Sequence, residues 1–300
     1  MGMQRRSETA GACLLFLFVA RFGLQSTKMR SYTLAAWVLL FAACASGACD
    51  KSPPPTIADR RAAEAAAPID DDMRQVVTVV SDGWNDFRAV LQRYERTRDK
   101  KWRRVGHPVD VVLGREGYGW GRGLHGTGAP QGRPGPTKRE GDGRSPAGVF
   151  AIGGAYGYEA ARDDISLPYT QATDELRCID DPKSSHYNRI VSTSDTPIDW
   201  QSAERMRRDD DLYTLVIVVA HNAAPTKAGA GSCIFLHLWE GPDKGMSGCT
   251  AMSLDALDEL AQWLRPGAAV LVALPRAEYE ALKRPWNLPF APALGSHDSR

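Results

Sequence analysis

The chain has 300 residues, which is enough for one large domain or two small ones. Its 43% hydrophobic and 24% charged residues are typical of an ordinary globular protein. The formal net charge is only +1 at pH 7, so the composition excludes a strongly basic field and predicts no nucleic-acid partner. The sequence contains no internal repeat, dinucleotide-binding fingerprint or P-loop.

Two short apolar runs, residues 12–20 and 34–45, stand near the N-terminus, and each follows basic residues. Both are shorter than the roughly 18 residues that a membrane-spanning helix needs. The second run ends in small residues, which is the form of a secretory signal. Residues 1–49 are therefore predicted to be a leader, and the mature chain is predicted to be exported to the periplasm or cell envelope.

The stretch from Phe41 to Cys44 resembles a bacterial lipobox, in which the cysteine is acylated and becomes the new N-terminus. This resemblance predicts lipidation at Cys44 and a membrane partner reached through a lipid anchor. Cys49 is a weaker candidate for the same modification, and ordinary cleavage after Ala45 is the alternative.

Other boundaries follow from composition. Residues 1–28 are interpreted as an over-extension of the reading frame, because Met29 begins a better signal than the first methionine; a single start with a long basic region is the alternative. Residues 50–72 are rich in Pro and Ala with little to bury, which predicts a flexible tether. A folded domain over 73–282 and an irregular tail over 283–300 complete the chain.

Apolar and β-branched segments predict most of the folded domain to be strands. These segments are residues 75–80, 109–114, the end of 138–152, 175–182, 213–222, 232–239 and 268–275. Apolar residues at helical spacing predict helices over 84–97 and over 254–264, with Ser253 as the N-cap of the second. The fold class is therefore β-rich, mixed α+β with a few helices.

Residues 117–136 are rich in glycine, which makes a regular element costly. We expect a mobile loop there, with a flap as its functional form. A phosphate cradle is disfavoured, because neither a GK[ST] sequence nor a strand–GxGxxG–helix context is present. The charges in the following loop are expected to be solvated, with substrate contact by Lys138 or Glu140 as the alternative.

The segment 234–253 is the one around which the domain is organised. It predicts a strand carrying His237, a loop rich in Gly and Pro, and then Ser247-Gly248-Cys249 before a helix. A thiol needs a nearby base to become a good nucleophile at neutral pH, and a hairpin-like loop would bring His237 to Cys249. Gly248 leaves room for a backbone N–H to approach a substrate oxygen. The pattern predicts a Cys/His acyl-transfer site.

A zinc site is a rival interpretation, with ligands from Cys233, His237 and Cys249 and a fourth from His221. Four residues along a straight strand span about 13 Å, which is too far for Cys233 and His237 to share one zinc ion. We therefore predict no metal and no other cofactor. A buried, hydrogen-bonded His237 and an inert buried Cys249 are the remaining structural alternatives.

The sequence HLWEGPDKGMSGCTAMS, residues 237–253, resembles the catalytic motif of the L,D-transpeptidase (YkuD-type) family. Upstream, KREGDGRSPAGVF, residues 138–150, resembles the K-x-[DE]-G-x-[TR]-P-x-G-x-[FY] stretch of that family. The segments ELRCIDDP and VVAHN sit where one branch of the family has comparable sequences. The resemblance covers roughly residues 75–275 and implies a β-sandwich-like fold, with peptidoglycan as the partner.

Carried over residue by residue, Cys249 matches the family's nucleophile and His237 its base. Gly248, with the Cys249 N–H, supplies part of the oxyanion environment, and Ser247 matches the serine two positions before the thiol. The implied mechanism uses a thiolate–imidazolium pair. The thiolate attacks the diaminopimelate carbonyl that precedes D-Ala in a tetrapeptide stem, and D-Ala leaves with a proton from the histidine.

Two positions depart from the family pattern. Leu238 stands where many members have glycine, and Ala251 stands where many have an arginine. A lost guanidinium removes a bidentate partner for a carboxylate, so the departure bears on substrate choice more than on chemistry. Family analogy also makes Tyr187 and Asn222 candidate pocket-lining, substrate-binding residues.

The acceptor of the acyl group stays open at this point. An amine would give a 3→3 cross-link or a protein attachment, whereas water would give an L,D-carboxypeptidase or a hydrolase that releases a linked protein. A non-catalytic peptidoglycan-binding lipoprotein is a further alternative, and the replaced arginine is its main support.

Cys178 and Cys233 remain once the leader cysteines and Cys249 are set aside. Export permits a disulfide, and both cysteines precede apolar strand residues on segments that could be neighbours. A Cys178–Cys233 bridge is predicted, with two buried free thiols as the alternative. His186 and His221 are expected to make local hydrogen bonds rather than to act in catalysis.

Overall fold

The computed structural model describes residues 67–293, so the predictions for the leader, for Cys44 and for most of the tether lie outside the described residues. The largest sheet of this region has ten strands. In chain order they are β1 (Gln75–Ser81), β2 (Arg88–Arg96), β3 (Trp102–Val112), β4 (Tyr118–Trp120), β7 (Ser145–Gly157), β8 (Tyr169–Gln171), β12 (Leu215–Val219), β13 (Phe235–Leu238), β14 (Thr250–Met252) and β15 (Ala269–Pro275).

Smaller elements surround this sheet. A three-stranded sheet, called the small sheet below, contains β9 (Leu176–Ile179), β10 (Ile190–Ser192) and β11 (Ala203–Arg205). A two-stranded ribbon contains β5 (Arg122–Gly123) and β6 (Gly126–Thr127). The helices are the 3-10 turn η1 (Asp211–Tyr213), α3 (Leu254–Trp263) and α4 (Arg276–Leu282). None of the helices between residues 67 and 293 has the length and apolar character to cross a membrane.

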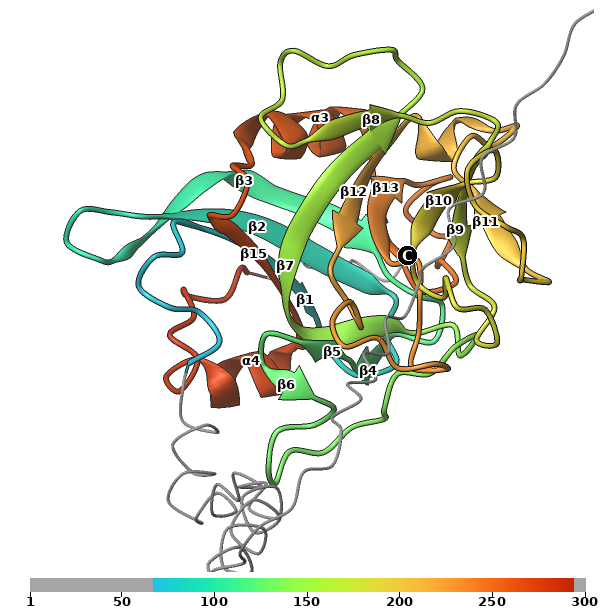
Figure 1. The fold of residues 1–300 in the computed structure, drawn as a ribbon. Helices are drawn as coiled ribbons and strands as arrows, with labels where there is room; N and C mark the ends of the chain where they lie inside the picture. Colours follow the sequence, from blue (N-terminus) through green and yellow to red (C-terminus); the bar gives the residue numbers. More distant parts are fainter. Residues whose placement is uncertain (1–66, 294–300) are drawn as a thin grey trace, which may run out of the picture. The chain divides into compact units, whose positions relative to one another are not determined.

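The large sheet returns on itself, as Figure 1 shows. Its strand order is β12-β13-β14-β3-β2-β1-β15-β7-β4, and β12 pairs with β7 as well as with β13. The long strand β7 makes this closure, because it pairs with β15 near its start and with β12 near its end. The predicted β-rich class with few helices is confirmed, whereas the arrangement is barrel-like and the sandwich is not confirmed.

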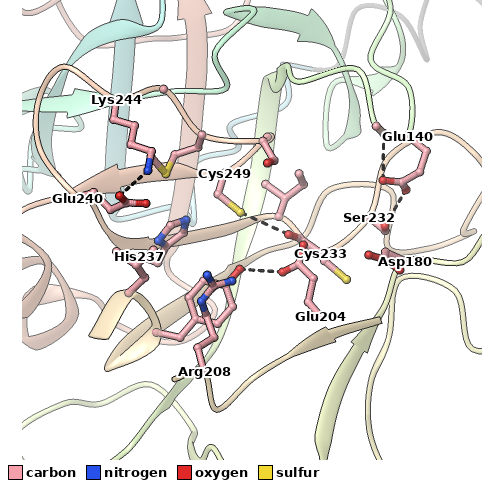
Figure 2. Close-up of a pocket in the computed structure, with 18 of the residues that line it drawn as sticks. Glu140, Asp180, Glu204, Arg208, Ser232, Cys233, His237, Glu240, Lys244 and Cys249 are labelled. Carbon is pink, nitrogen blue, oxygen red and sulfur yellow. Dashed lines mark hydrogen bonds and ion pairs between the residues drawn. The ribbon is translucent and has the colours of Figure 1, made fainter. Parts of the chain in front are cut away.

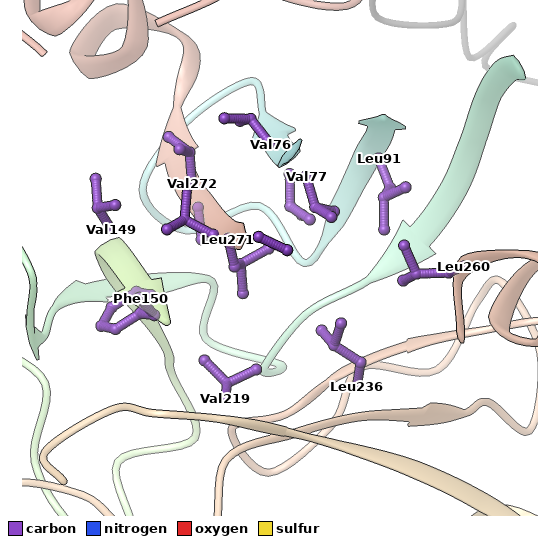
Figure 3. Close-up of a cluster of buried hydrophobic side chains, with 14 of the residues drawn as sticks. Val76, Val77, Leu91, Val149, Phe150, Val219, Leu236, Leu260, Leu271 and Val272 are labelled. Atoms are coloured by element: carbon purple, nitrogen blue, oxygen red, sulfur yellow. The ribbon is translucent and has the colours of Figure 1, made fainter. Parts of the chain in front are cut away.

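The core lies around the parallel pair β1 and β15, in which every residue is buried (Figure 3). The β1 segment is predicted from its β-branched residues and the β15 segment from its apolar run, and both are buried throughout. The outer cover comes from α4, which packs on β15 and β1, and from Trp286 and Leu288 after it. The predicted irregular tail therefore contributes two side chains to the core before the described residues end.

The second predicted helix is confirmed as α3. Leu257, Leu260 and Ala261 face the core, and each buried leucine contributes about 1.5–3 kcal/mol. Ser253 occupies the N-cap position with extended backbone but makes no capping hydrogen bond through its side chain. The helix is held by its apolar face rather than by its cap.

The helix predicted over residues 84–97 is wrong, because the segment forms strand β2 between β1 and β3. Both faces of β2 are covered at Val90, Leu91 and Gln92, so the polar–apolar alternation of a half-exposed strand is absent. The remaining apolar positions then mimic helical spacing. Pairing with strands distant in sequence overrides this local pattern.

The glycine-rich segment 117–136 packs against the core at its start, whereas most residues in 124–135 are exposed, and the flap stays a prediction. Tyr118 and Trp120 are buried, and the Tyr118 hydroxyl donates to the carbonyl of Val79 over 3.0 Å. A Cβ at Gly117, where φ is +76°, would come within 2.2 Å of the Trp84 carbonyl oxygen. Glycine here lets the chain pass close to its neighbours.

Packed structure begins before the predicted boundary at residue 73. Ile69, which lies within the predicted tether, is 1% exposed and belongs to the core. The Asp70 carbonyl accepts a hydrogen bond from the Arg96 guanidinium over 2.8 Å. The end of the tether thus joins the core through Ile69 and joins Arg96 of β2 through Asp70 and through the Asp71 carboxylate, 3.2 Å from the guanidinium.

Candidate active site

Parallel pairing of two short strands sets the positions of the predicted catalytic residues. His237 of β13 is opposite Ala251 of β14, and Cys249 directly precedes β14. Side chains two residues apart on a strand share a face, so Cys249 falls on the face of β14 that meets His237, about 7 Å further along. The loop between the two strands brings the chain back to the end of β13 at which that strand begins. The two strands therefore run parallel, whereas a hairpin-like loop was predicted.

The nucleophile candidate is held by backbone contacts. The Cys249 thiol donates to the Cys233 carbonyl over 3.4 Å, and the Phe235 N–H donates to the sulfur over 3.3 Å. The Ser145 hydroxyl donates to the Cys249 carbonyl over 3.0 Å, and it accepts from the Gly114 N–H over 2.8 Å. Ser145 belongs to the stretch 138–150 that resembles the family's upstream motif, so this stretch contacts the backbone of the cysteine.

The imidazole of His237 is buried beside an aromatic ring. Its Nδ1 lies 2.7 Å from the Leu238 carbonyl oxygen, and its ring centroid is 5.1 Å from that of Tyr213 in an edge-on arrangement. Because a carbonyl only accepts, Nδ1 carries the proton of the neutral ring and Nε2 keeps the lone pair. This tautomer leaves Nε2 as the nitrogen that can accept a proton.

Burial shifts both groups toward their neutral forms. It raises the pKa of the Cys249 thiol well above its usual range, and the charge of Glu204 adds to this shift. It lowers the pKa of His237 to about 4, although the hydrogen bond to Leu238 acts in the opposite direction. Both shifts favour the neutral thiol and the neutral imidazole over the thiolate–imidazolium pair that the resemblance implies.

Both side chains line a cavity of about 450 Å³ between β13, the loop before β14 and the small sheet (Figure 2). Its other lining residues are mostly polar. They are Lys138, Glu140, Gly141, Asp180, Glu204, Arg208, Leu212, Tyr213, Ser232, Cys233, Ile234, Glu240, Lys244, Gly245, Met246, Ser247 and Gly248. A chain of polar groups next to a thiol can bind and orient a charged peptide.

Carboxylates gather on the wall that comes from the small sheet. Glu204 lies on β11, Asp180 follows β9, and Glu140 lies in the KREGDGR loop. Glu204 accepts a hydrogen bond from the Tyr213 hydroxyl over 2.7 Å, and burial raises its pKa to about 7. Oδ1 of Asp180 is buried without a hydrogen-bond partner among the described residues. This wall can receive a cationic group.

Sequence reasoning missed most of this wall. The ELRCIDDP segment is predicted as a strand and matched to a branch of the family without a site role, although two successive carboxylates at its end, Asp180 and Asp181, are a visible signal. Glu204 and Arg208 carried no such signal, because the segment around them has no motif. The guanidinium of Arg208 lies 5.0 Å from the Tyr213 ring centroid and pairs with Asp210 over 2.7 Å.

The remaining predicted site residues divide into two groups. Ser247 and Gly248 line the cavity beside Cys249, the first exposed and the second buried. Tyr187 and Asn222 are not among the residues that line it. The Tyr187 hydroxyl donates to the Glu140 carboxylate, one layer behind the wall, whereas the Asn222 amide donates to the Lys227 and Gly231 carbonyls and closes a turn. Asn222 therefore supports the loop rather than the substrate.

A disulfide joins Cys178 of β9 to Cys233, just before β13. It connects the small sheet that carries Glu204 to the strand that carries His237. Cys233 is therefore no thiolate ligand for zinc, and within residues 67–293 no group of three or more His, Cys, Asp or Glu residues is arranged to hold a metal. His221 makes the local contacts expected of it, with Nε2 at 3.0 Å from the Ala230 carbonyl oxygen.

The two departures from the family motif occupy different environments. Ala251 is completely buried and packs with Val112 and Met246. Leu238 is partly buried at the end of β13 and packs against the core. The position of the replaced arginine is thus an apolar site in this chain.

Comparison with known proteins gives one family. The model of the YkuD family, described as the L,D-transpeptidase catalytic domain, matches residues 111–272. A search of curated proteins finds no match. Among solved structures, one titled "Structure of Bdellovibrio bacteriovorus Bd1075" is 12% identical, with 71% of this chain and 54% of that chain covered at a TM-score of 0.34, which is too low to carry an argument. This chain thus spans about half of that one.

The residues matched by the family model include Ser145, whose hydroxyl donates to the Cys249 carbonyl, and the motif with His237 and Cys249. It extends over more than half of the chain, from the end of β3 into β15. The chain belongs to the YkuD family, whose domain is an L,D-transpeptidase catalytic domain.

Proposed function

We propose that this protein is an exported cysteine acyltransferase that acts on peptidoglycan stem peptides as an L,D-transpeptidase. One observation carries the proposal. The parallel pairing of β13 with β14 puts His237 and Cys249 on one face and in one cavity, next to Gly248. A thiol, a base and a side-chain-free loop are the groups that acyl transfer requires.

The reaction begins from the neutral pair. Nε2 of His237 takes the thiol proton as Sγ of Cys249 attacks the substrate carbonyl, which forms the S–C bond and places the carbonyl electron pair on oxygen. Collapse of this intermediate breaks the C–N bond, and the leaving D-Ala amine takes the proton from His237. The thioester that remains is then resolved by an acceptor.

The carboxylates of the cavity support an amine as acceptor rather than water. Asp180 and Glu204 are carboxyl groups of the same cavity as the thiol, and an ammonium group is attracted to such groups before it is deprotonated. L,D-carboxypeptidase activity, with water as acceptor, uses the same thioester.

A non-catalytic peptidoglycan-binding protein is the second candidate. It is favoured by the resting thiol, which donates to the Cys233 carbonyl and has a raised pKa. Catalytic hydrogen bonds often form only in the substrate complex, so this resting geometry leaves the enzyme as the first candidate.

Export and lipid anchoring through Cys44 belong to the same proposal. The Cys178–Cys233 disulfide supports an oxidising compartment, since such bonds are rare in the cytosol. The acylated Cys44 would attach the domain to a membrane of the cell envelope, with residues 50–66 and the start of the described region as the connection.

The test is intact-mass spectrometry of residues 68–300 mixed with a disaccharide-tetrapeptide muropeptide. A Cys249 adduct followed by a 3→3 dimer supports the transpeptidase, and a tripeptide product without dimer supports the carboxypeptidase. Cys249→Ala is the control and should form neither. A folded protein that forms no adduct and no product would favour the binding-protein candidate.

A further inference from the structure

The KREGDGR loop contains a buried ammonium group that the proposed mechanism does not use. The side chain of Lys138 is 3% exposed, and its Nζ donates to Asp142 over 2.5 Å and to the Arg139 carbonyl over 2.6 Å. Its methylenes lie against Gly231, where an added Cβ would be 3.1 Å from Cε of the lysine. A charge this deeply buried is costly unless it is paired and hydrogen-bonded, and Asp142 is the charge that pairs with it.

The ammonium is directed at the nucleophile loop. A Cβ built on Gly248 would lie 3.8 Å from Nζ of Lys138 and 3.2 Å from the Arg144 carbonyl oxygen. Lys138, Gly248 and Cys249 line the same cavity. The absence of a side chain at Gly248 is therefore what leaves the lysine open to the space beside the thiol.

The ammonium also has donor capacity to spare. Asp142 and the Arg139 carbonyl account for two of its three hydrogens, and in the described part of the chain the third has no acceptor. The loop does not depend on the lysine alone, since Asp142 also accepts from the N–H groups of Arg139 over 2.7 Å and Arg144 over 3.0 Å.

We propose that Lys138 is a catalytic residue that stabilises the oxyanion of the acyl-transfer intermediate, together with the backbone N–H groups at Gly248 and Cys249. This inference rests on the proposed function. When Sγ of Cys249 attacks, the carbonyl electron pair moves to oxygen, and the third Nζ–H donates to that oxygen. Lys138 keeps its proton throughout; the thiol proton moves to His237 and then to the leaving amine.

The physical reason is electrostatic. A fixed positive group in a site shielded from water stabilises developing negative charge far more than it would in bulk water. The arginine of other family members is replaced here by the buried Ala251, so no guanidinium comes from that position. Lys138 supplies a cation to the cavity from a different element.

The experiment compares two reactions of the same thiol in Lys138→Met. Acylation by a carbapenem passes through an oxyanion, whereas alkylation by iodoacetamide is a displacement at carbon that forms none. We expect the acylation rate to fall by about 10²- to 10³-fold, the range for loss of one oxyanion donor, and the alkylation rate to fall far less. Arg139→Met is the matched control at the exposed neighbouring residue and should change neither rate.

Equal losses in both reactions, or no loss of acylation, would overturn the proposal. Thermal unfolding of each variant checks the fold; if Lys138→Met does not fold, the same split is read from Lys138→Arg, which keeps the charge, and Lys138→Gln, which does not. If carbapenem acylation depends on Lys138 but the wild-type protein does not react with muropeptides, the role of Lys138 is supported and peptidoglycan is rejected as the substrate. A wild-type thiol that alkylates but is not acylated would reject both.

Discussion

The thiol of Cys249 donates a hydrogen bond to the backbone carbonyl of Cys233, with Sγ and O separated by 3.4 Å. Cys233 has a positive φ of 53° and is the disulfide partner of Cys178. The nucleophile is thus held by a turn that is itself tied to the small sheet. The disulfide that stabilises the domain therefore also fixes the carbonyl to which the thiol is hydrogen-bonded.

Removing the disulfide with Cys178→Ser and Cys233→Ser together should lower the free energy of unfolding by about 4 kcal/mol, because the bond closes a loop with a sequence separation of 55 residues. Acylation of Cys249 should slow as well, since the turn at Cys233 that positions the thiol is no longer tied to the small sheet. Urea unfolding measures the first effect. Reductant should reproduce the shift in the wild type and leave the double variant unchanged; a wild type with two free thiols and an unchanged midpoint would contradict the prediction.

The pH dependence of acylation should reflect the buried imidazole. Because burial lowers the pKa of His237 to about 4, the acid limb of kcat/KM should lie near pH 4 and not near the ordinary value of about 6.5. The unfolded chain binds the proton first, so this group makes stability fall as the pH falls from about 6.5 to about 4.

The check is the rate of carbapenem acylation between pH 3.5 and 8. His237→Gln should lower the plateau by about 10²- to 10⁴-fold and remove the limb. An acid limb near pH 6.5 in the wild type would mean that the imidazole is more solvated than the structure indicates.

Glu204→Gln should make the thiol more reactive. Burial raises the pKa of this carboxyl to about 7, and its charge raises the pKa of Cys249, so neutralising it should lower the thiol pKa and speed alkylation above pH 7. Iodoacetamide kinetics against pH measure this shift, and Glu240→Gln, at the other side of the cavity, is the matched control. A slower reaction in Glu204→Gln than in the control would contradict the assigned charge effect.

The same variant should change stability in a defined pH window. The folded pKa of Glu204 is raised above its unfolded value, so the wild type loses stability as the pH rises from about 4.5 to about 7. The loss should be about 1–3 kcal/mol, and Glu204→Gln should lack it. The urea unfolding midpoints of the wild type and of Glu204→Gln at pH 5 and pH 7.5 test this. The same change in midpoint between the two pH values in both proteins would refute it.

Restoring the family arginine with Ala251→Arg should not restore a family-like site. Ala251 is fully buried between Val112 and Met246, so a guanidinium there has no charge partner and should cost about 3–5 kcal/mol. Ser247→Arg, at an exposed position beside the same thiol, is the control and should be close to neutral. Thermal unfolding of both variants measures the cost. A stable, active Ala251→Arg variant would contradict the prediction and show that β14 can shift to accommodate the side chain.

The fold shows which local patterns carry through to three dimensions. The segments at β1, β12 and β15 are strands in the structure and are buried almost throughout. Uninterrupted apolar residues indicate this burial at β12 and β15, and β-branched residues indicate the strand at β1. The same condition misled at β2, where apolar residues at helical spacing lie in a strand. Nothing within that segment distinguishes the two outcomes, because its partners come from other parts of the chain.

The sequence by itself determined the motif chemistry: His237, Ser247, Gly248 and Cys249 are close along the chain, and short spacing with glycine constrains what a loop can do. Only the tertiary structure decided the barrel-like closure through β7 and the wall formed by Asp180 and Glu204. Those features depend on contacts between residues far apart in sequence. They form only when strands from the whole domain pair and bury their side chains, and no local sequence pattern specifies which distant strands pair.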